Sequence, residues 1–204
     1  MTNEYFGGLD FGSSGARISI INIYKEIIFE DSCNYIYEFK NPEGWINSCI
    51  KLFEGIPIQI KINLSRLSIS GTSGTLVPCR SNGNILGNSI PYNEACTTNS
   101  KKLKLIAGGD KFLNNPYSSL AKAIKLIDIF GDDIILRHQA DWISGWFLND
   151  WSFGEEGNNV KLGWNIENKS WPESFKSFSL TKSIPVIKKS GSILGKINQS
   201  IANL

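Results

Sequence analysis

The first part of the chain alternates apolar and polar positions with the period of β-strands. Residues 16–23 place Ala16 and Ile18 on one face and Arg17 on the other, as expected of a half-buried strand. Residues 5–10 and 26–37 have a similar strand-forming composition. We therefore predict three consecutive strands at the start of the chain.

The spacing of apolar residues becomes helical after Asn41. Asn41 is followed by Pro42, a pair typical of a helix N-terminus, and apolar side chains then recur at helical intervals as far as Phe53. Gly55 and Pro57 are predicted to end this helix. Three later segments also have helical character: residues 94–107, 116–130 and 141–148.

Short strands are predicted between these helices. Residues 64–69 resemble a strand, and residues 76–79 and 85–86 flank an Asn-Gly-Asn turn in the manner of a hairpin. The chain after Trp164 has no clear periodicity. Strands followed by mixed elements predict an α/β or α+β fold.

The composition narrows the functional classes. Hydrophobic residues make up 41% of the 204 residues and charged residues 20%, with a net charge of +2. These values exclude a disordered chain and a protein held on nucleic acid by its charge. One histidine and four dispersed cysteines argue against a zinc site. No apolar run is close to the length of a membrane-spanning helix, which is about eighteen residues or more. No secretory signal pattern opens the chain, so a cytoplasmic protein with reduced thiols is expected.

The strongest chemical signal is the segment Gly-Leu-Asp-Phe-Gly-Ser-Ser-Gly-Ala-Arg at residues 8–17. It predicts a strand ending in Asp10, a small hydroxyl-bearing turn and a second strand. Turn amides and hydroxyls can bind an anion, and a carboxylate at a strand end can hold Mg²⁺. A dinucleotide fingerprint is excluded because a strand rather than a helix follows the glycines. A plain hairpin turn remains the alternative.

A second glycine- and hydroxyl-rich segment follows the strand predicted over residues 64–69. Residues 70–75 read Ser-Gly-Thr-Ser-Gly-Thr, and strand ends are common ligand sites in α/β sheets. Taken alone, this segment is better explained as a loop before a hairpin.

Together these segments resemble the FGGY carbohydrate kinases over almost the whole chain. Residues 10–15 resemble the family's opening motif, D-x-G-[ST]-[ST]-x-[KR], with the basic Arg17 close after them. Residues 71–93 are similar to its sugar-side loop and return segment. Three later segments are also similar to family motifs: residues 138–143 (QADW), 155–164 (DxxNALKLGY) and 184–195, the end of the first domain.

The resemblance implies a ribonuclease H-like (actin-like ATPase) α/β domain with a mixed β-sheet flanked by helices. The implied reaction is ATP-dependent phosphorylation of a sugar, with ATP and Mg²⁺ as cofactors, and the family allows a dimer. The Gly-Thr-Ser-Gly-Thr loop is similar to the ribulose- and xylulose-kinase-like branch of cyanobacteria and plants. That branch points to a ketopentose such as ribulose or xylulose.

The family's functional residues carry over to two groups of positions. The residues implied to contact the phosphates are Gly12, Ser13, Ser14, Gly15 and Arg17. The residues implied to contact the sugar are Asp10, Gly71, Thr72, Ser73 and Asn158. Asp10 is also the expected Mg²⁺ ligand, between the metal and the sugar.

The chain departs from the family pattern in several ways. Ser70 stands where relatives in this branch often have Asp, and Glu155 stands for Asp. The family's catalytic base and adenosine-binding glycines lie in a second domain, which no residue here matches. Residues 1–204 are thus expected to be the N-terminal, sugar-side domain, inactive alone. The alternative is a non-catalytic sugar-binding or regulatory module of the actin-like ATPase group.

Two further polar residues invite a catalytic interpretation. Asp141 is better explained as a charge in the first turn of a helix. His138 is the one histidine of the chain, and catalysis by histidine generally needs a partner. We therefore expect both residues to be structural.

Overall fold

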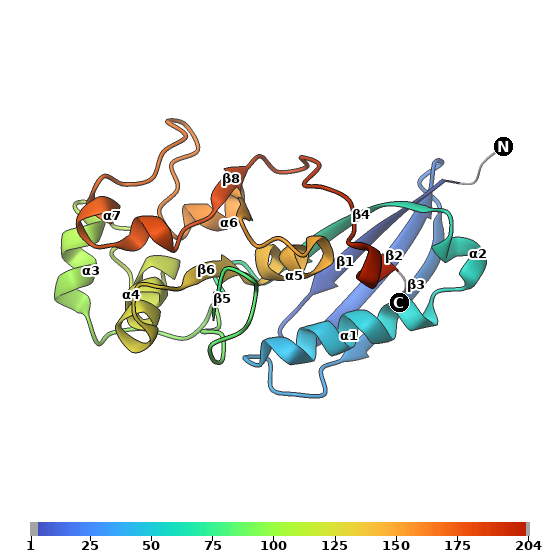
Figure 1. Cartoon of the computed structure of the whole chain (residues 1–204), viewed down its shortest axis with the longest axis horizontal. Helices are drawn as coiled ribbons and strands as arrows, with labels where there is room; N and C mark the ends of the chain where they lie inside the picture. Colours follow the sequence, from blue (N-terminus) through green and yellow to red (C-terminus); the bar gives the residue numbers. More distant parts are fainter. Residues whose placement is uncertain (1–3, 203–204) are drawn as a thin grey trace. The chain divides into compact units, whose positions relative to one another are not determined.

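The computed structural model describes residues 4–202, which divide into two compact units (Figure 1). Among the described residues, the first unit comprises residues 4–72 with 198–202, and the second comprises Ser73–Ile197. The boundary falls within the glycine- and hydroxyl-rich segment 70–75. The expectation that residues 1–204 form one kinase domain stays a prediction.

The first unit is built on a four-stranded mixed sheet. Its strands are β1 (Tyr5–Phe11), β2 (Gly15–Asn22), β3 (Ile27–Asn34) and β4 (Leu64–Gly71), in the order β3-β2-β1-β4. β2 is antiparallel to both β1 and β3, and β4 is parallel to β1. All four predicted strands are confirmed, although β3 ends three residues before the predicted position.

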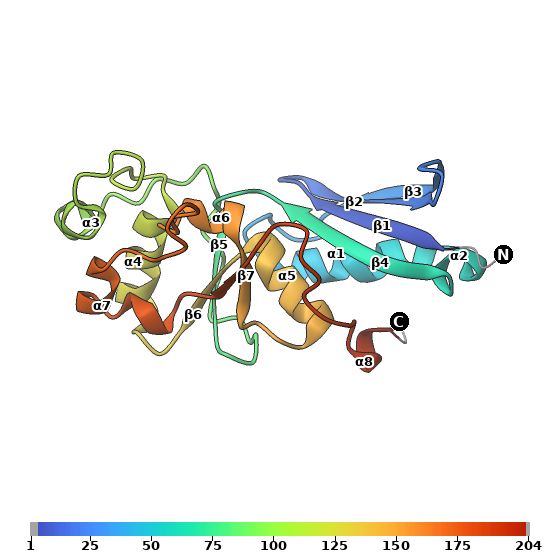
Figure 2. The same cartoon turned by 90° about the horizontal axis from the view of Figure 1, so that it is seen from above.

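One face of this sheet is apolar and carries helix α1 (Pro42–Gly55), which lies along it in Figure 2. Ala16, Ile18 and Ile20 are buried on this face, as the alternation predicted. On the helix, Trp45 and Cys49 are buried as expected. The predicted start is confirmed, because the Asn41 side chain accepts a hydrogen bond from the Glu43 amide at 2.9 Å. A short helix, α2 (Ile58–Lys61), leads into β4.

The second unit is centred on two buried antiparallel strands, β5 (Leu76–Cys79) and β6 (Ile135–His138). Its core includes helices α3 (Ser100–Ala107) and α4 (Ser119–Phe130). The hairpin predicted after β5 is only a single bridge, Cys79 to Ile85. All four residues of β5 are buried, and β6, more than fifty residues later, supplies the full ladder that such a strand needs.

The helix predicted over 94–107 is shorter than expected, because residues 94–99 are not helical. The helix predicted at 141–148 is confirmed as α5 (Gln139–Leu148). It is followed by β7 (Phe153–Glu155) and α6 (Glu156–Val160), and β7 pairs in parallel with β8 (Val186–Lys188).

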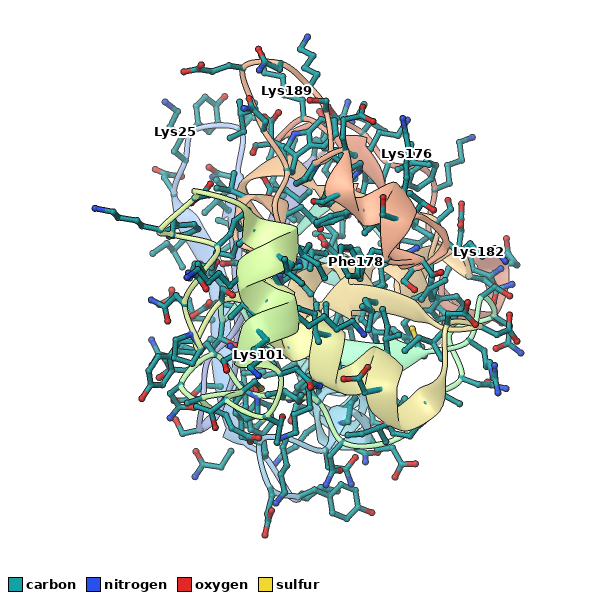
Figure 3. The ribbon with its side chains drawn as sticks, turned by 90° about the vertical axis from the view of Figure 1, so that its left-hand side faces the viewer. Lys25, Lys101, Lys176, Phe178, Lys182 and Lys189 are labelled. Carbon is teal, nitrogen blue, oxygen red and sulfur yellow. The ribbon has the colours of Figure 1, made fainter. Side chains whose placement is uncertain are left out.

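The aperiodic segment after Trp164 contributes to the core through isolated side chains rather than through long elements. It holds α7 (Ser174–Ser177) and the 3-10 helix η1 (Leu180–Lys182), and Phe175 is fully buried. Phe178 packs against the core and lies near the middle of the view in Figure 3, whereas Lys176 and Lys189 lie closer to its periphery. A last short helix, α8 (Gln199–Ala202), belongs to the first unit.

Among residues 4–202, no helix has the length and apolar character that crossing a bilayer requires.

Candidate functional site

The sheet face opposite α1 is polar near the end of β1. The strand register aligns Ser70, Asp10, Arg17 and Ser32 in one row across β4, β1, β2 and β3. All four side chains are exposed. Within the described part of the chain, no ion pair involves Asp10. The Asp10 carboxylate is therefore an accessible group at the end of its strand.

A tight turn connects β1 to β2 next to Asp10. The Gly12 amide donates to the Gly15 carbonyl at 2.9 Å and closes the turn. The hydroxyl-bearing residues at its tip, Ser13 and Ser14, are exposed. These two residues can therefore present their hydroxyl groups to a ligand without any rearrangement of the turn.

Tyr35 supports this turn from the end of β3. Its hydroxyl donates to the Gly12 carbonyl at 2.8 Å, and its amide donates to the Ser14 carbonyl at 3.2 Å. Both carbonyls are thereby held by one residue that directly follows the neighbouring strand β3. No pattern in the sequence indicates this role, since Tyr35 lies in the irregular end of the predicted third strand.

The two glycines of the turn differ in how much space a side chain would have at their positions. Neither has a positive φ. A Cβ on Gly15 would lie 2.2 Å from the Cys33 carbonyl oxygen of β3, whereas a Cβ on Gly12 would be at ordinary contact distance, 3.6 Å from Gly15 O. Strand packing thus accounts for Gly15, a residue that the family resemblance assigns to the phosphates.

The second hydroxyl-rich segment begins at the same edge of the sheet. The parallel pairing of β1 with β4 sets Asp10 opposite Ser70 and Phe11 opposite Gly71. Thr72, the last residue of the first unit in this segment, is half-buried. The two loops that the sequence singled out therefore leave adjacent strands side by side.

Ser73 and Asn158 belong to the second unit, where each takes part in a separate hydrogen bond. The Lys161 ammonium donates to the Ser73 carbonyl at 3.1 Å. The Asn158 amide donates to Oε2 of Glu155, which caps α6, at 2.7 Å. Lys161 was not predicted as a site residue, although it lies in the segment 155–164 that carries part of the resemblance.

Electrostatics around Glu155 stabilise its charged form. Burial raises the pKa of Glu155, but hydrogen bonds from Ser190 Oγ and from the Gly157 and Asn158 amides outweigh burial, so the pKa lies below its ordinary value. A charged Glu155 is a strong acceptor for the first amides of α6. It thereby fixes the helix that carries Asn158.

A serine, a histidine and an aspartate meet in the interior of the second unit. Ser119 Oγ lies 3.0 Å from His138 Nε2, but His138 Nδ1 is 3.7 Å from Asp141 Oδ2, too far for a hydrogen bond. All three residues are buried. Asp141 instead accepts hydrogen bonds from the Glu155 amide and from Asn159 Nδ2, both at 3.0 Å. The group therefore ties α5 to α6 and is closed to a substrate.

The donors at the end of β1 are of the type that Mg²⁺ binds. Asp10 offers an exposed carboxylate and Ser13 and Ser14 offer hydroxyl oxygens. Residues 4–202 contain no group of three or more His, Cys, Asp or Glu side chains able to hold a metal. An ion held by Asp10 would thus take its other ligands from water and phosphate, as Mg²⁺ usually does.

Comparison with known proteins identifies the fold. No family model matches the sequence. Solved structures that match 98% of the chain include xylulose kinase from Rhodospirillum rubrum (TM-score 0.83, 12% identity) and Plasmodium falciparum glycerol kinase with ADP (TM-score 0.78, 15% identity). Gluconate kinase from Lactobacillus acidophilus matches with a TM-score of 0.79 and 14% identity. The chain spans about half of each, 46%, 46% and 45%. It therefore has the mixed α/β fold of the corresponding part of carbohydrate kinases.

Proposed function

We propose that this chain is the N-terminal, sugar-side part of an ATP-dependent carbohydrate kinase of the FGGY type, with a ribonuclease H-like fold. One observation carries the proposal: the register of β1 with β4 brings the Asp10 turn and the loop that begins at Gly71 to one edge of a single sheet. A phosphate-binding turn and a sugar-binding loop have to be neighbours for transfer between their ligands. The kinase folds of the structural neighbours support the same reaction class.

In this proposal, the turn holds the terminal phosphate of ATP. The Ser13 and Ser14 hydroxyls donate to its oxygens, and Arg17 adds a positive charge on the same face of the sheet. Asp10 holds Mg²⁺, which neutralises charge on the phosphates when bound. Preorganised donors of this kind lower the barrier because they do not reorient during transfer.

The sugar is assigned to Asp10, Gly71, Thr72, Ser73 and Asn158. The Gly-Thr-Ser-Gly-Thr loop supports a ketopentose, ribulose or xylulose, of the branch found in cyanobacteria and plants. Hydroxyl and amide side chains suit a substrate that is itself rich in hydroxyl groups.

The test is sugar binding by the purified chain. Calorimetric titration with ribulose, xylulose, glycerol and gluconate should show the tightest binding for a ketopentose. Asp10→Asn keeps the shape but removes the charged acceptor, and should weaken that binding by roughly 10- to 100-fold, since hydrogen bonds to a charged group contribute roughly 1.5–3 kcal/mol. Glu30→Gln, a carboxylate on the same face of the sheet, is the matched control and should bind as the wild type does.

The outcomes separate the kinase from its alternative. Absence of binding to every sugar would contradict the proposal. Ketopentose binding that Asp10→Asn leaves unchanged would favour a non-catalytic sugar-binding or regulatory module. In a coupled assay the 204-residue chain should show no sugar-dependent ATP turnover, because the expected catalytic base has no counterpart in it; turnover would overturn that expectation.

A further inference from the structure

Lys161 contacts the turn at Ser73 and Gly74, where the second unit begins. Its ammonium donates to the Ser73 carbonyl at 3.1 Å. Gly74 has a φ of +95°, and its ideal Cβ position lies only 3.4 Å from Lys161 Cδ. The aliphatic part of Lys161 therefore packs on the turn while its charge holds the preceding carbonyl.

The backbone of Lys161 is itself anchored. Its carbonyl accepts a hydrogen bond from the Ser119 amide, at the start of α4, at 3.1 Å. Lys161 follows α6 directly and lies three residues after Asn158. One residue thus connects the helix that carries Asn158, the first turn of α4 and the Ser73 turn.

Two neutral hydrogen bonds hold Thr75, at the end of the turn. Thr75 is fully buried, its hydroxyl accepts from the Tyr92 amide at 3.1 Å, and its carbonyl accepts from the Gln139 amide at 3.1 Å. Ser73 is half-buried. The Ser73 carbonyl, by contrast, accepts a charge-assisted hydrogen bond, from the Lys161 ammonium.

We propose that Lys161 is a positioning residue that fixes the Ser73–Gly74 turn and thereby sets the affinity for the sugar. This inference rests on the proposed function, which assigns Ser73 and Asn158 to the sugar. Lys161 acts through both residues. It holds the turn that contains Ser73, and it directly follows α6, the helix that carries Asn158. Its role requires an ammonium or guanidinium, since a neutral side chain of the same length would keep the packing but lose the charged donor.

The experiment compares three variants of the full chain. Lys161→Met removes the charge and keeps a long aliphatic side chain, and Lys161→Arg keeps the charge. Lys104→Met removes an exposed lysine from α3 in the same unit. Two properties are measured: amide hydrogen exchange, peptide by peptide, and the dissociation constant for the ketopentose that binds the wild type.

Lys161→Met should exchange about tenfold faster at residues 73–75 and bind the sugar about tenfold more weakly, while exchange in β6 and in the centre of α4 stays at the wild-type rate. Lys161→Arg should recover most of both properties, and Lys104→Met should equal the wild type. The proposal is wrong if Lys161→Met binds the sugar normally, or if its faster exchange extends equally through β6 and α4, as a purely structural role predicts.

A wild-type chain that binds no sugar would overturn the proposed function and the affinity role together. Exchange at residues 73–75 is independent of any ligand. It would then show separately whether Lys161 holds the turn.

Discussion

At the scale of single residues, Lys122 is the least expected feature of the molecule. Its side chain is fully buried, and its ammonium donates to the Tyr117 carbonyl and, at 3.4 Å, to the Tyr92 carbonyl. Burial lowers the pKa of Lys122 to about 8, and the nearby charge of Lys161 lowers it as well. The sequence places Lys122 in a predicted helix, where a lysine normally faces solvent.

The pKa of Lys122 predicts a pH dependence of stability. Between about pH 8 and 10.5 the unfolded chain binds a proton at this residue that the folded chain has released, so the contribution of Lys122 to the free energy of unfolding rises with pH. Lys122→Met lacks this rise. The wild type should therefore gain stability relative to Lys122→Met as the pH increases from 7.5 to 10, measured by thermal unfolding.

Comparison of two proteins is needed because other groups titrate in this range. Burial raises the pKa of Cys79 to about 12, which lowers stability above about pH 9 in both proteins and cancels in the difference. Lys101→Met, at an exposed position, should keep a constant difference from the wild type. A constant difference for Lys122→Met would contradict the prediction.

The sequence indicates some residues of the site and not others. Asp10 and the serines of its turn can be recognised because a carboxylate, glycines and hydroxyls follow one another in the sequence. Tyr35 and Lys161 act on those loops from 20 and more residues away. Their contacts exist only after folding, so spacing along the chain could not indicate them.

At the scale of elements, the pairing of β2 with β3 depends on glycine at position 15, because glycine has no Cβ. A Cβ there would lie 2.2 Å from the Cys33 carbonyl and 3.1 Å from Cα of Asn34. Both contacts are with backbone, which cannot move aside as a flexible side chain can. Gly15→Ala should therefore destabilise the fold by about 1–3 kcal/mol, the usual cost of overpacking.

Gly12→Ala is the matched comparison for this prediction. Its Cβ would be 3.6 Å from the nearest atom, so its midpoint of urea unfolding should stay close to that of the wild type. Equal midpoints for Gly15→Ala and the wild type would show that β3 can shift away from β2 at no cost.

The sequence predicts the helices and strands that have a periodic pattern of their own. It does not predict the pairing of strands that lie far apart along the chain. The strands β1 to β4 and helix α1 follow alternation and capping signals within their own sequences. The pairing of β5 with β6 was missed because an Asn-Gly-Asn turn suggested a closer partner. Phe175 and Leu180 complete the core from an aperiodic segment, where no periodicity marks buried positions.

At the scale of the whole molecule, the division into two units could not be read from the sequence. No linker or change in composition marks Thr72, because the chain passes from one unit to the other inside a loop with a proposed role in binding. The family resemblance is spread over five segments of the sequence, and the match with kinase structures at 12–15% identity confirms the mixed α/β fold.

The division predicts that damage to one unit can open it separately, since a compact unit with its own contacts can unfold below the global transition. Gly83 in the second unit offers the test. It has a φ of +81°, and a Cβ would lie 2.2 Å from the ring of Trp151. Gly83→Ala should accelerate amide exchange in β5, β6 and α5 by about tenfold or more, while β1–β4 and α1 keep the wild-type rates.

Gly109→Ala, whose Cβ would meet open space, is the control. Equal acceleration in both units would mean that the chain unfolds as one cooperative body, and that the boundary at Thr72 is geometric rather than energetic.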